Sequence, residues 1–179
     1  MQIAQSKTRE QFPLSARKVL KKTLTGSLVW IILSLIGYAG AIFGIEAQGT
    51  GWLGLVTFGI FGSLALIILL TYLYQRWYYA VYFYDLTHDY IVIKKGPITP
   101  QEITIPYERV QDVYVDQDLL DRFLGLYDVH LSSATFSSAM AAHIDGVEKQ
   151  AADGLRAVIL HTVSERISKR KVPVPPQAQ

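Results

Sequence analysis

The sequence contains no cysteine among its 179 residues. The chain can therefore form neither a disulfide framework nor a thiolate metal site, and the absence fits a reducing compartment. Charged residues are also scarce, at 18% of the chain against about a quarter in soluble globular domains. Between Thr23 and Gln75 the only charged residue is Glu46. The shortage of charge thus belongs to one segment, and the rest of the chain has ordinary polarity.

Residue patterns that carry catalysis are missing as well. The four histidines, at positions 88, 130, 143 and 161, include no pair with the spacing of a helical zinc site. The serine pairs at 132–133 and 137–138 have no nucleophile-elbow context, and no glycine-rich phosphate loop follows a predicted strand. We therefore predict a protein that is not an enzyme and has no catalytic, cofactor-binding or metal-binding residues. The net charge of +2 is too small to indicate nucleic-acid binding.

Two long uncharged runs, Leu24–Ile45 and Trp52–Tyr74, fill the charge-poor segment. Each has about 22 residues, which as a helix measure ~33 Å and would cross a ~30 Å hydrocarbon core. Because only a short linker joins them, we predict a transmembrane helical hairpin over residues 23–75. A cleaved signal peptide is the alternative for the first run, but its basic flank and apolar run are longer than such peptides have. Neither run contains an ionisable residue other than tyrosine, so we interpret the hairpin as an anchor and not as a transport pathway.

Glycines recur along the hairpin and let helices approach closely where lipid supplies no hydrophobic drive. We predict that they pack the two helices against each other, with dimerisation as the alternative. The glycines concerned are Gly40, Gly44, Gly51, Gly54, Gly59 and Gly62.

Lysine and arginine are distributed unequally around the hairpin. Six precede the first run, none lies in the linker, and Arg76 follows the second run. The positive-inside rule then predicts a multi-pass protein of the cell (plasma) membrane, with both termini and the C-terminal domain in the cytoplasm. The basic residues nearest the bilayer either contact its surface, at about 1 kcal/mol each near an anionic leaflet, or serve only to fix the topology. These candidate membrane-surface residues are Arg17, Lys18, Lys21, Lys22 and Arg76.

After the hairpin the pattern changes to short alternating runs bounded by turn residues, which is typical of strands. Predicted strands cover residues 77–85, 90–94, 101–105, 110–117 and 127–134, with a turn and one poor strand over 136–144. An apolar stripe predicts an amphipathic helix that opens at Gly146 and runs to Thr162. The fold class is therefore α+β: a curved antiparallel sheet or open barrel with a C-terminal capping helix. The expected parts are a basic N-terminal segment (1–22), the hairpin (23–75), the sheet domain (76–163) and a basic, proline-containing flexible tail (164–179).

A short helix is predicted between the strands, from Asp118 as N-cap to Gly125 at its end. Arg122 follows Asp118 by four residues, the favourable order for an acid-base pair on a helix. Two interpretations of Arg122 stay open: a structural pair with Asp118, or a contact with a partner protein.

Several short pieces occur in order along residues 24–163 and resemble a known family. The pieces are Tyr84-Asp-Leu-Thr87, Lys95-Gly96, Ile105-Pro106, Val110-Gln-Asp-Val113, Gln117, Arg122 and Leu124-Gly125. Together with the preceding hairpin they resemble the prokaryotic PH-like, membrane-flanked family, the YdbS-like proteins, whose function is largely unknown. The resemblance implies a PH-like fold in a membrane setting and supplies no activity. Residues 136–145 depart most from the family pattern.

Two functions remain open at this point. In the first, the protein is a membrane-anchored scaffold whose PH-like domain binds a protein partner or another copy of itself beside the lipid bilayer. In the second, it is an accessory subunit of a membrane transport or export system. Specific phosphoinositide binding is disfavoured, because the first strand-turn-strand, at Leu86–Asp89, contains no lysine or arginine.

Overall fold

The computed structural model describes residues 6–43, 51–133 and 142–170. These residues form two compact units. The helical unit comprises Val19–Ala80, and the sheet unit comprises the chain up to Lys18 together with the chain from Val81 onward. The N-terminal residues thus belong to the sheet unit, although the whole hairpin separates them from it in sequence.

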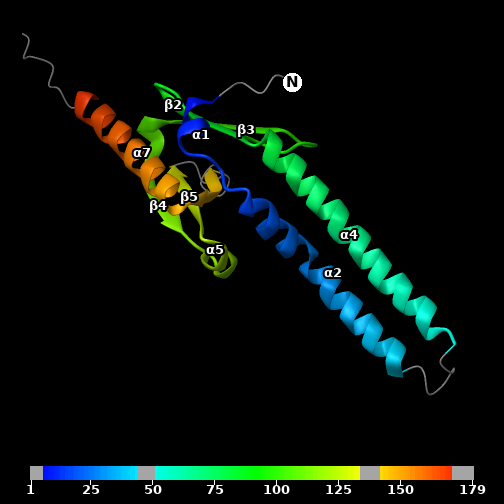
Figure 1. Cartoon of the computed structure of the whole chain (residues 1–179). Helices are drawn as coiled ribbons and strands as arrows, with labels where there is room; N and C mark the ends of the chain where they lie inside the picture. The colour runs from blue at the N-terminus through cyan, green and yellow to red at the C-terminus, as the bar shows by residue number, and fades with distance from the viewer. Residues whose placement is uncertain (1–5, 44–50, 134–141, 171–179) are drawn as a thin grey trace, which may run out of the picture. The chain divides into compact units, whose positions relative to one another are not determined.

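The helical unit consists of α2 (Arg17–Phe43) and α4 (Leu53–Val81), which run side by side and antiparallel (Figure 1). Both helices are long and apolar enough to cross a membrane. None of the 29 residues of α4 is buried, and its large apolar side chains face outward, as Phe58 does at 83% exposure. Side chains of this kind on the outside of a helix are suited to a lipid environment.

Contacts between α2 and α4 involve only some of the hairpin glycines. A Cβ atom at Gly26 would lie 3.3 Å from the Thr71 methyl group, and the rings of Tyr38 and Phe61 meet edge to face at 5.3 Å. By contrast, a Cβ at Gly40 would meet no atom of the described residues within 4 Å, and the same holds for Gly51, Gly54, Gly59 and Gly62. The prediction that these five glycines pack the hairpin is wrong, because the contacts between α2 and α4 occur instead at Gly26, Gly37 and Tyr38. Gly44 lies outside the described residues.

The predicted strand from Trp77 is also wrong. α4 continues to Val81, and β1 (Phe83–Leu86) begins only after it. Aromatic residues favour strands, but no glycine or proline interrupts residues 63–81. Extending an existing helix by one residue costs much less than starting a new element, so the helix continues through the aromatic cluster.

The sheet unit is built on two three-stranded antiparallel sheets. The first has the order β1-β2-β3, with β2 (Tyr90–Lys95) paired to β3 (Gln101–Pro106). A single 3-10 turn, η1 (Tyr107–Arg109), leads to the second sheet of β4 (Val110–Asp116), β5 (Leu126–Ser133) and β6 (His143–Glu148). The helix α5 (Leu119–Leu124) connects β4 to β5. This is the expected α+β arrangement, with curved PH-like sheets followed by a C-terminal helix.

Helices cover these sheets from both ends of the chain. The C-terminal helix α7 (Lys149–Arg170) packs against β4, β5 and η1, while the short α1 (Lys7–Gln11) packs against β1 (Figure 1). α7 is longer than predicted, so residues 164–170, expected in the flexible tail, are helical. Gly146, expected to open the helix, instead lies inside β6.

One β-bulge changes which side chains of β4 reach the core. The pairing of β4 with β5 shifts between Val110 and Asp112, so that one residue is inserted between them. Val110 is therefore buried on the same side as Val113. Strict alternation along residues 110–117 predicts Val110 on the face of Asp112, opposite Val113, because alternation has no signal for an inserted residue.

The core lies between the sheets and the apolar stripe of α7. Ala151, Leu155, Ile159 and Val163 recur every four residues on this stripe and are all buried. Val158, an apolar residue that the helical pattern also assigns to the stripe, is 39% exposed.

We expect Leu155→Ala to lower the free energy of unfolding by about 2–5 kcal/mol, since it empties space around a fully buried leucine. Leu160→Ala on the same helix is the matched control, because Leu160 is 42% exposed and should cost less than about 1 kcal/mol. Denaturant unfolding of the detergent-solubilised chain, followed by near-ultraviolet circular dichroism, compares the two. Equal losses would contradict burial of the stripe.

Candidate functional site

The segment Ser6–Lys18, here called the N-terminal arm, contacts the rest of the sheet unit at three points. The first is the carboxylate of Asp85 on β1. The Thr8 hydroxyl donates to Asp85 Oδ1 at 2.7 Å, and the Ser6 hydroxyl lies 2.9 Å from the same oxygen and 2.6 Å from the Tyr84 carbonyl oxygen. Burial of the Asp85 carboxyl raises its pKa, but the hydrogen bonds from Thr8 and Ser6 lower it by more, so the pKa of Asp85 lies below its ordinary value.

The second point is the middle of the arm. The Tyr84 hydroxyl donates to the carbonyl oxygen of Phe12, and the Phe12 ring occupies the space that a Cβ at Gly154 of α7 would need. Leu14 is 5% exposed and forms an antiparallel bridge with Val147 of β6. The arm therefore forms one isolated bridge to β6 and contacts α7 through the Phe12 ring.

The third point is a buried ion pair at the end of the arm. Lys18 Nζ lies 2.6 Å from Asp145 Oδ1, and the two side chains are only 2% and 7% exposed. The same ammonium group lies 3.8 Å from the centroid of the Tyr82 ring, at a distance that favours a cation-π interaction. The Tyr82 hydroxyl in turn donates to the His143 carbonyl oxygen at 2.8 Å, which holds the ring in place.

Gly146 makes this ion pair possible. Its φ of +77° lies in the left-handed region, and a Cβ there would lie 2.7 Å from the Lys18 Cβ. A side chain at position 146 would thus be strained and would push the Lys18 stem out of its place. The carbonyl oxygen of Gly146 also accepts from the Ser15 amide at 2.9 Å, so backbone and side-chain contacts coincide at this residue.

These contacts change the interpretation of the predicted membrane-surface residues. Lys18 is buried inside the sheet unit and bound to Asp145, so it is not available as a surface charge. Lys21 is 5% exposed and Lys22 is half-buried, whereas Arg17 and Arg76 are exposed. For Arg17, Lys22 and Arg76 the membrane contact stays a prediction.

Arg122 lies on α5 and is exposed. Its predicted partner Asp118 is the N-cap: the Asp118 carboxylate accepts from the Asp121 amide at 2.7 Å, and the Asp121 carboxylate accepts from the Asp118 amide at 3.3 Å. Within the described part of the chain no ion pair joins Arg122 to Asp118. The capping box holds Asp118 at the start of α5, and both interpretations of Arg122 stay predictions.

One group of described residues has the donor atoms of a metal site. Oxygens of Asp116 and Asp128 and a ring nitrogen of His130 all lie within 4.8 Å of one another on β4 and β5. Asp116 faces Asp128 across the pair of strands β4 and β5. The Asp116 Oδ1 lies 3.1 Å from His130 Nε2, and Asp128 Oδ1 accepts a hydrogen bond from the Gly146 amide at 2.7 Å. Because existing hydrogen bonds account for this grouping, we assign no ion to it.

Arg166, which is distant in sequence from the β1–β2 turn, contacts that turn in the folded structure. The Arg166 guanidinium of α7 donates to the His88 carbonyl oxygen at 2.6 Å and to Asp89 Oδ1 at 2.8 Å. The hydrogen bond from His88, and then the charge and hydrogen bond of Arg166, hold the pKa of Asp89 below its ordinary value. The guanidinium of Arg166 is therefore already bound to the turn, and this arrangement gives no support to recognition of a lipid head group there.

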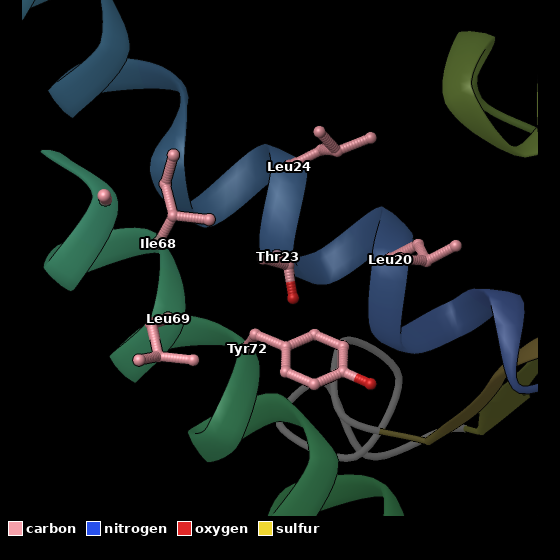
Figure 2. A pocket seen from close by; sticks show the side chains of 7 residues that line it. Leu20, Thr23, Leu24, Ile68, Leu69 and Tyr72 are labelled. Atoms are coloured by element: carbon pink, nitrogen blue, oxygen red, sulfur yellow. The ribbon is translucent and has the colours of Figure 1, made fainter. Parts of the chain in front are cut away.

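A groove lies between the two long helices of the helical unit (Figure 2). Its volume is about 520 Å³. The Thr23 hydroxyl in its wall donates to the Val19 carbonyl oxygen at 2.7 Å. Since the other walls are almost entirely apolar, the groove suits acyl chains and offers little for polar recognition. The lining residues are Leu20, Thr23, Leu24, Ala65, Ile68, Leu69 and Tyr72.

The two antiparallel sheets and the single C-terminal helix define a PH-like module carried by two membrane-length helices. The bacterial PH domain family matches residues 25–163, and the chain belongs to this family. No match was found among curated proteins or solved structures. The family match begins after the N-terminal arm, although the arm is packed into the module.

Lys18→Met keeps the length of the side chain but leaves the Asp145 carboxylate buried without its cation. We expect a loss of about 3–5 kcal/mol in the stability of the sheet unit, the range for breaking a buried ion pair from one side. The double variant Lys18→Met/Asp145→Asn should recover part of this loss, because no charge is then left buried. The measurement is denaturant unfolding of the full chain in detergent. Lys7→Met, an exposed lysine on the same arm, is the control, and a Lys18→Met variant as stable as this control would refute the buried pair.

Asp85 should make docking of the arm sensitive to acid. Because its folded-state pKa is lowered, its contribution is fully present above the unfolded value of 3.8 and is lost as the pH falls through the lower folded-state value. Asp85→Asn should therefore lower the thermal midpoint at about pH 7, and its difference from the wild type should shrink towards about pH 3. Asp153→Asn, at an exposed position of α7, should show no such convergence. A constant Asp85→Asn difference over this range would be the contrary result.

Proposed function

We propose that this protein is a non-enzymatic, membrane-anchored interaction protein that presents its PH-like domain at the cytoplasmic face of the cell membrane. The observation that carries the proposal is the docked N-terminal arm. Because of it, the chain enters the membrane helices from the sheet unit at Lys18 and returns to the same unit at Val81.

This double connection supports a hairpin that crosses the membrane twice. Two helices whose outer ends both belong to one compact unit must have those ends on the same side of the bilayer. The excess of lysine and arginine before α2, together with Arg76 near the end of α4, favours the cytoplasmic side for that unit. Both termini are then cytoplasmic.

The double connection also restrains the domain. A domain on one long linker samples a large volume, whereas this one is held by the arm through Lys18 and by α4 through Val81. A module connected to the membrane helices at two points suits a surface that is offered to a protein partner or to a second copy. We therefore favour scaffolding over the alternative, an accessory subunit of a transport or export system.

Reporter fusions test the topology. Green fluorescent protein, which fluoresces in the cytoplasm, should be bright when fused after Gln179 and dark when inserted at Gln48. Alkaline phosphatase, which is active outside, should show the opposite pattern. Phosphatase activity at Gln179 would overturn the cytoplasmic placement.

A pull-down in mild detergent tests the role. A tagged copy should recover an untagged second copy or a non-transporter protein, and the recovery should survive mutation of the hairpin glycines that face outward, such as Gly59→Ala. Stoichiometric recovery of transporter subunits would instead establish the accessory role.

A further inference from the structure

The helix α5 presents large apolar side chains to solvent. Leu119 and Phe123 are each 87% exposed, and Leu120 is 37% exposed. Leu119 and Phe123 are four residues apart and so lie on one face of the helix. Exposure of two such residues side by side is unusual for a surface that meets only water.

α5 is held rigidly in this presentation. The capping box of Asp118 and Asp121 closes its N-terminus, and Gly125 ends it with a φ of +69°. Beyond the helix, Gln117 Nε2 donates to the Leu126 carbonyl oxygen at 2.6 Å. The carboxylate of Asp121 is buried, whereas the N-cap Asp118 and Arg122 are the exposed charged residues beside the apolar side chains of α5.

A hydrogen bond ties α5 to the start of the first membrane helix. Arg17 Nη1, on the first residue of α2, donates to the carbonyl oxygen of Leu124 at 3.1 Å. The uncharged run of α2 begins at Thr23. Six residues cover about 9 Å as helix and at most ~22 Å when extended. The covalent chain therefore limits how far Leu124 can lie from the start of the uncharged run of α2.

We propose that α5 inserts Leu119 and Phe123 into the interfacial region of the adjacent leaflet, as a third membrane attachment beside α2 and α4. This inference rests on the proposed membrane anchoring. The exposed guanidinium of Arg122 then lies at the level of the lipid phosphates, where cations are favoured. An inserted apolar face with a basic flank is how interfacial helices bind membranes.

The small size of the patch favours lipid over a protein occupant. A stable protein interface buries about 800 Å² on each partner, which three side chains do not supply. Shallow insertion into lipid needs only a few apolar side chains, because the anchor already supplies proximity.

The cysteine-free sequence allows a direct test in the full chain. A single Leu120→Cys variant, labelled with an environment-sensitive nitrobenzoxadiazole probe, keeps both proposed inserting residues. The chain is placed as one copy per nanodisc of phosphatidylcholine and phosphatidylglycerol, with nitroxide-labelled phosphatidylcholine as quencher. We expect blue-shifted emission and strong quenching at position 120. The control label at Ile167→Cys, on the end of α7 far from α5 within the sheet unit (Figure 1), should stay in water and be quenched several-fold less.

Two further variants make the outcomes distinct. Adding Leu119→Ser and Phe123→Ser, at positions too exposed to disturb folding, should reduce quenching at 120 to the level at 167. Quenching that persists would show that the probe inserts by itself and would overturn the proposal, as would equal quenching at 120 and 167. Burial of the probe only with two copies per disc would identify a second copy as the occupant and also overturn it. A label at Leu66→Cys in α4 reports the anchor itself: quenching at 66 without quenching at 120 refutes the insertion alone, whereas no quenching at 66 refutes the membrane anchoring.

Discussion

The buried pair of Lys18 and Asp145 is the contact on which the arrangement of this protein depends. Removing two charges from water costs several kcal/mol for each, and only close geometry and further stabilisation offset that cost. Here the charged atoms are 2.6 Å apart, the Tyr82 ring lies beside the ammonium group, and the missing side chain of Gly146 leaves room for the lysine stem. The pair joins residues 127 positions apart. It determines where the first membrane helix leaves the domain.

The path of the chain has a consequence for assembly. The arm is synthesised first, but its docking partners on β1, β6 and α7 follow the hairpin. Ser6–Lys18 contacts Asp85, Asp145 and Gly154, which all follow the hairpin in sequence. The arm can therefore complete its docking only after both long helices have been made, and the hairpin then lies between two covalent connections to one folded unit.

Membrane attachment in this family member is then a property of several surfaces with different physics. The helices α2 and α4 contribute apolar length, the arm connects them to the sheet unit through one ion pair, and α5, bonded at Leu124 to Arg17, offers a small apolar face. The β1–β2 turn, by contrast, directs Arg166 inward to Asp89 and His88. The membrane contact that we propose therefore lies at α5 and not at this turn.

Local sequence determined much of the fold. The uncharged runs predicted both membrane-length helices, the turn residues at Leu86–Asp89 and Lys95–Pro97 separated the strands of the first sheet, and Asp118 with Gly125 bounded α5. Each of these signals acts over a few residues, through chain length, backbone conformation or capping, and so can be read without knowing the rest of the molecule. The errors at Trp77, Val110 and Gly146 arose where a continuing helix, a bulge or a neighbouring side chain outweighed the local preference.

Tertiary structure alone decided the role of the arm. Lys18 has the same basic neighbours as Lys21 and Lys22, and nothing near it in sequence distinguishes a lysine that faces lipid phosphates from one that is buried. Its partner Asp145 lies in a segment with a weak hydrophobic pattern. The next residue, Gly146, is the glycine that leaves room for the Lys18 side chain. A long-range ion pair produces no repeating residue pattern in either segment, because it depends on how two segments distant in sequence come together in the fold. The sequence thus determined that the chain has a membrane hairpin and a PH-like domain, and only the folded structure decided that the segment before the hairpin completes that domain.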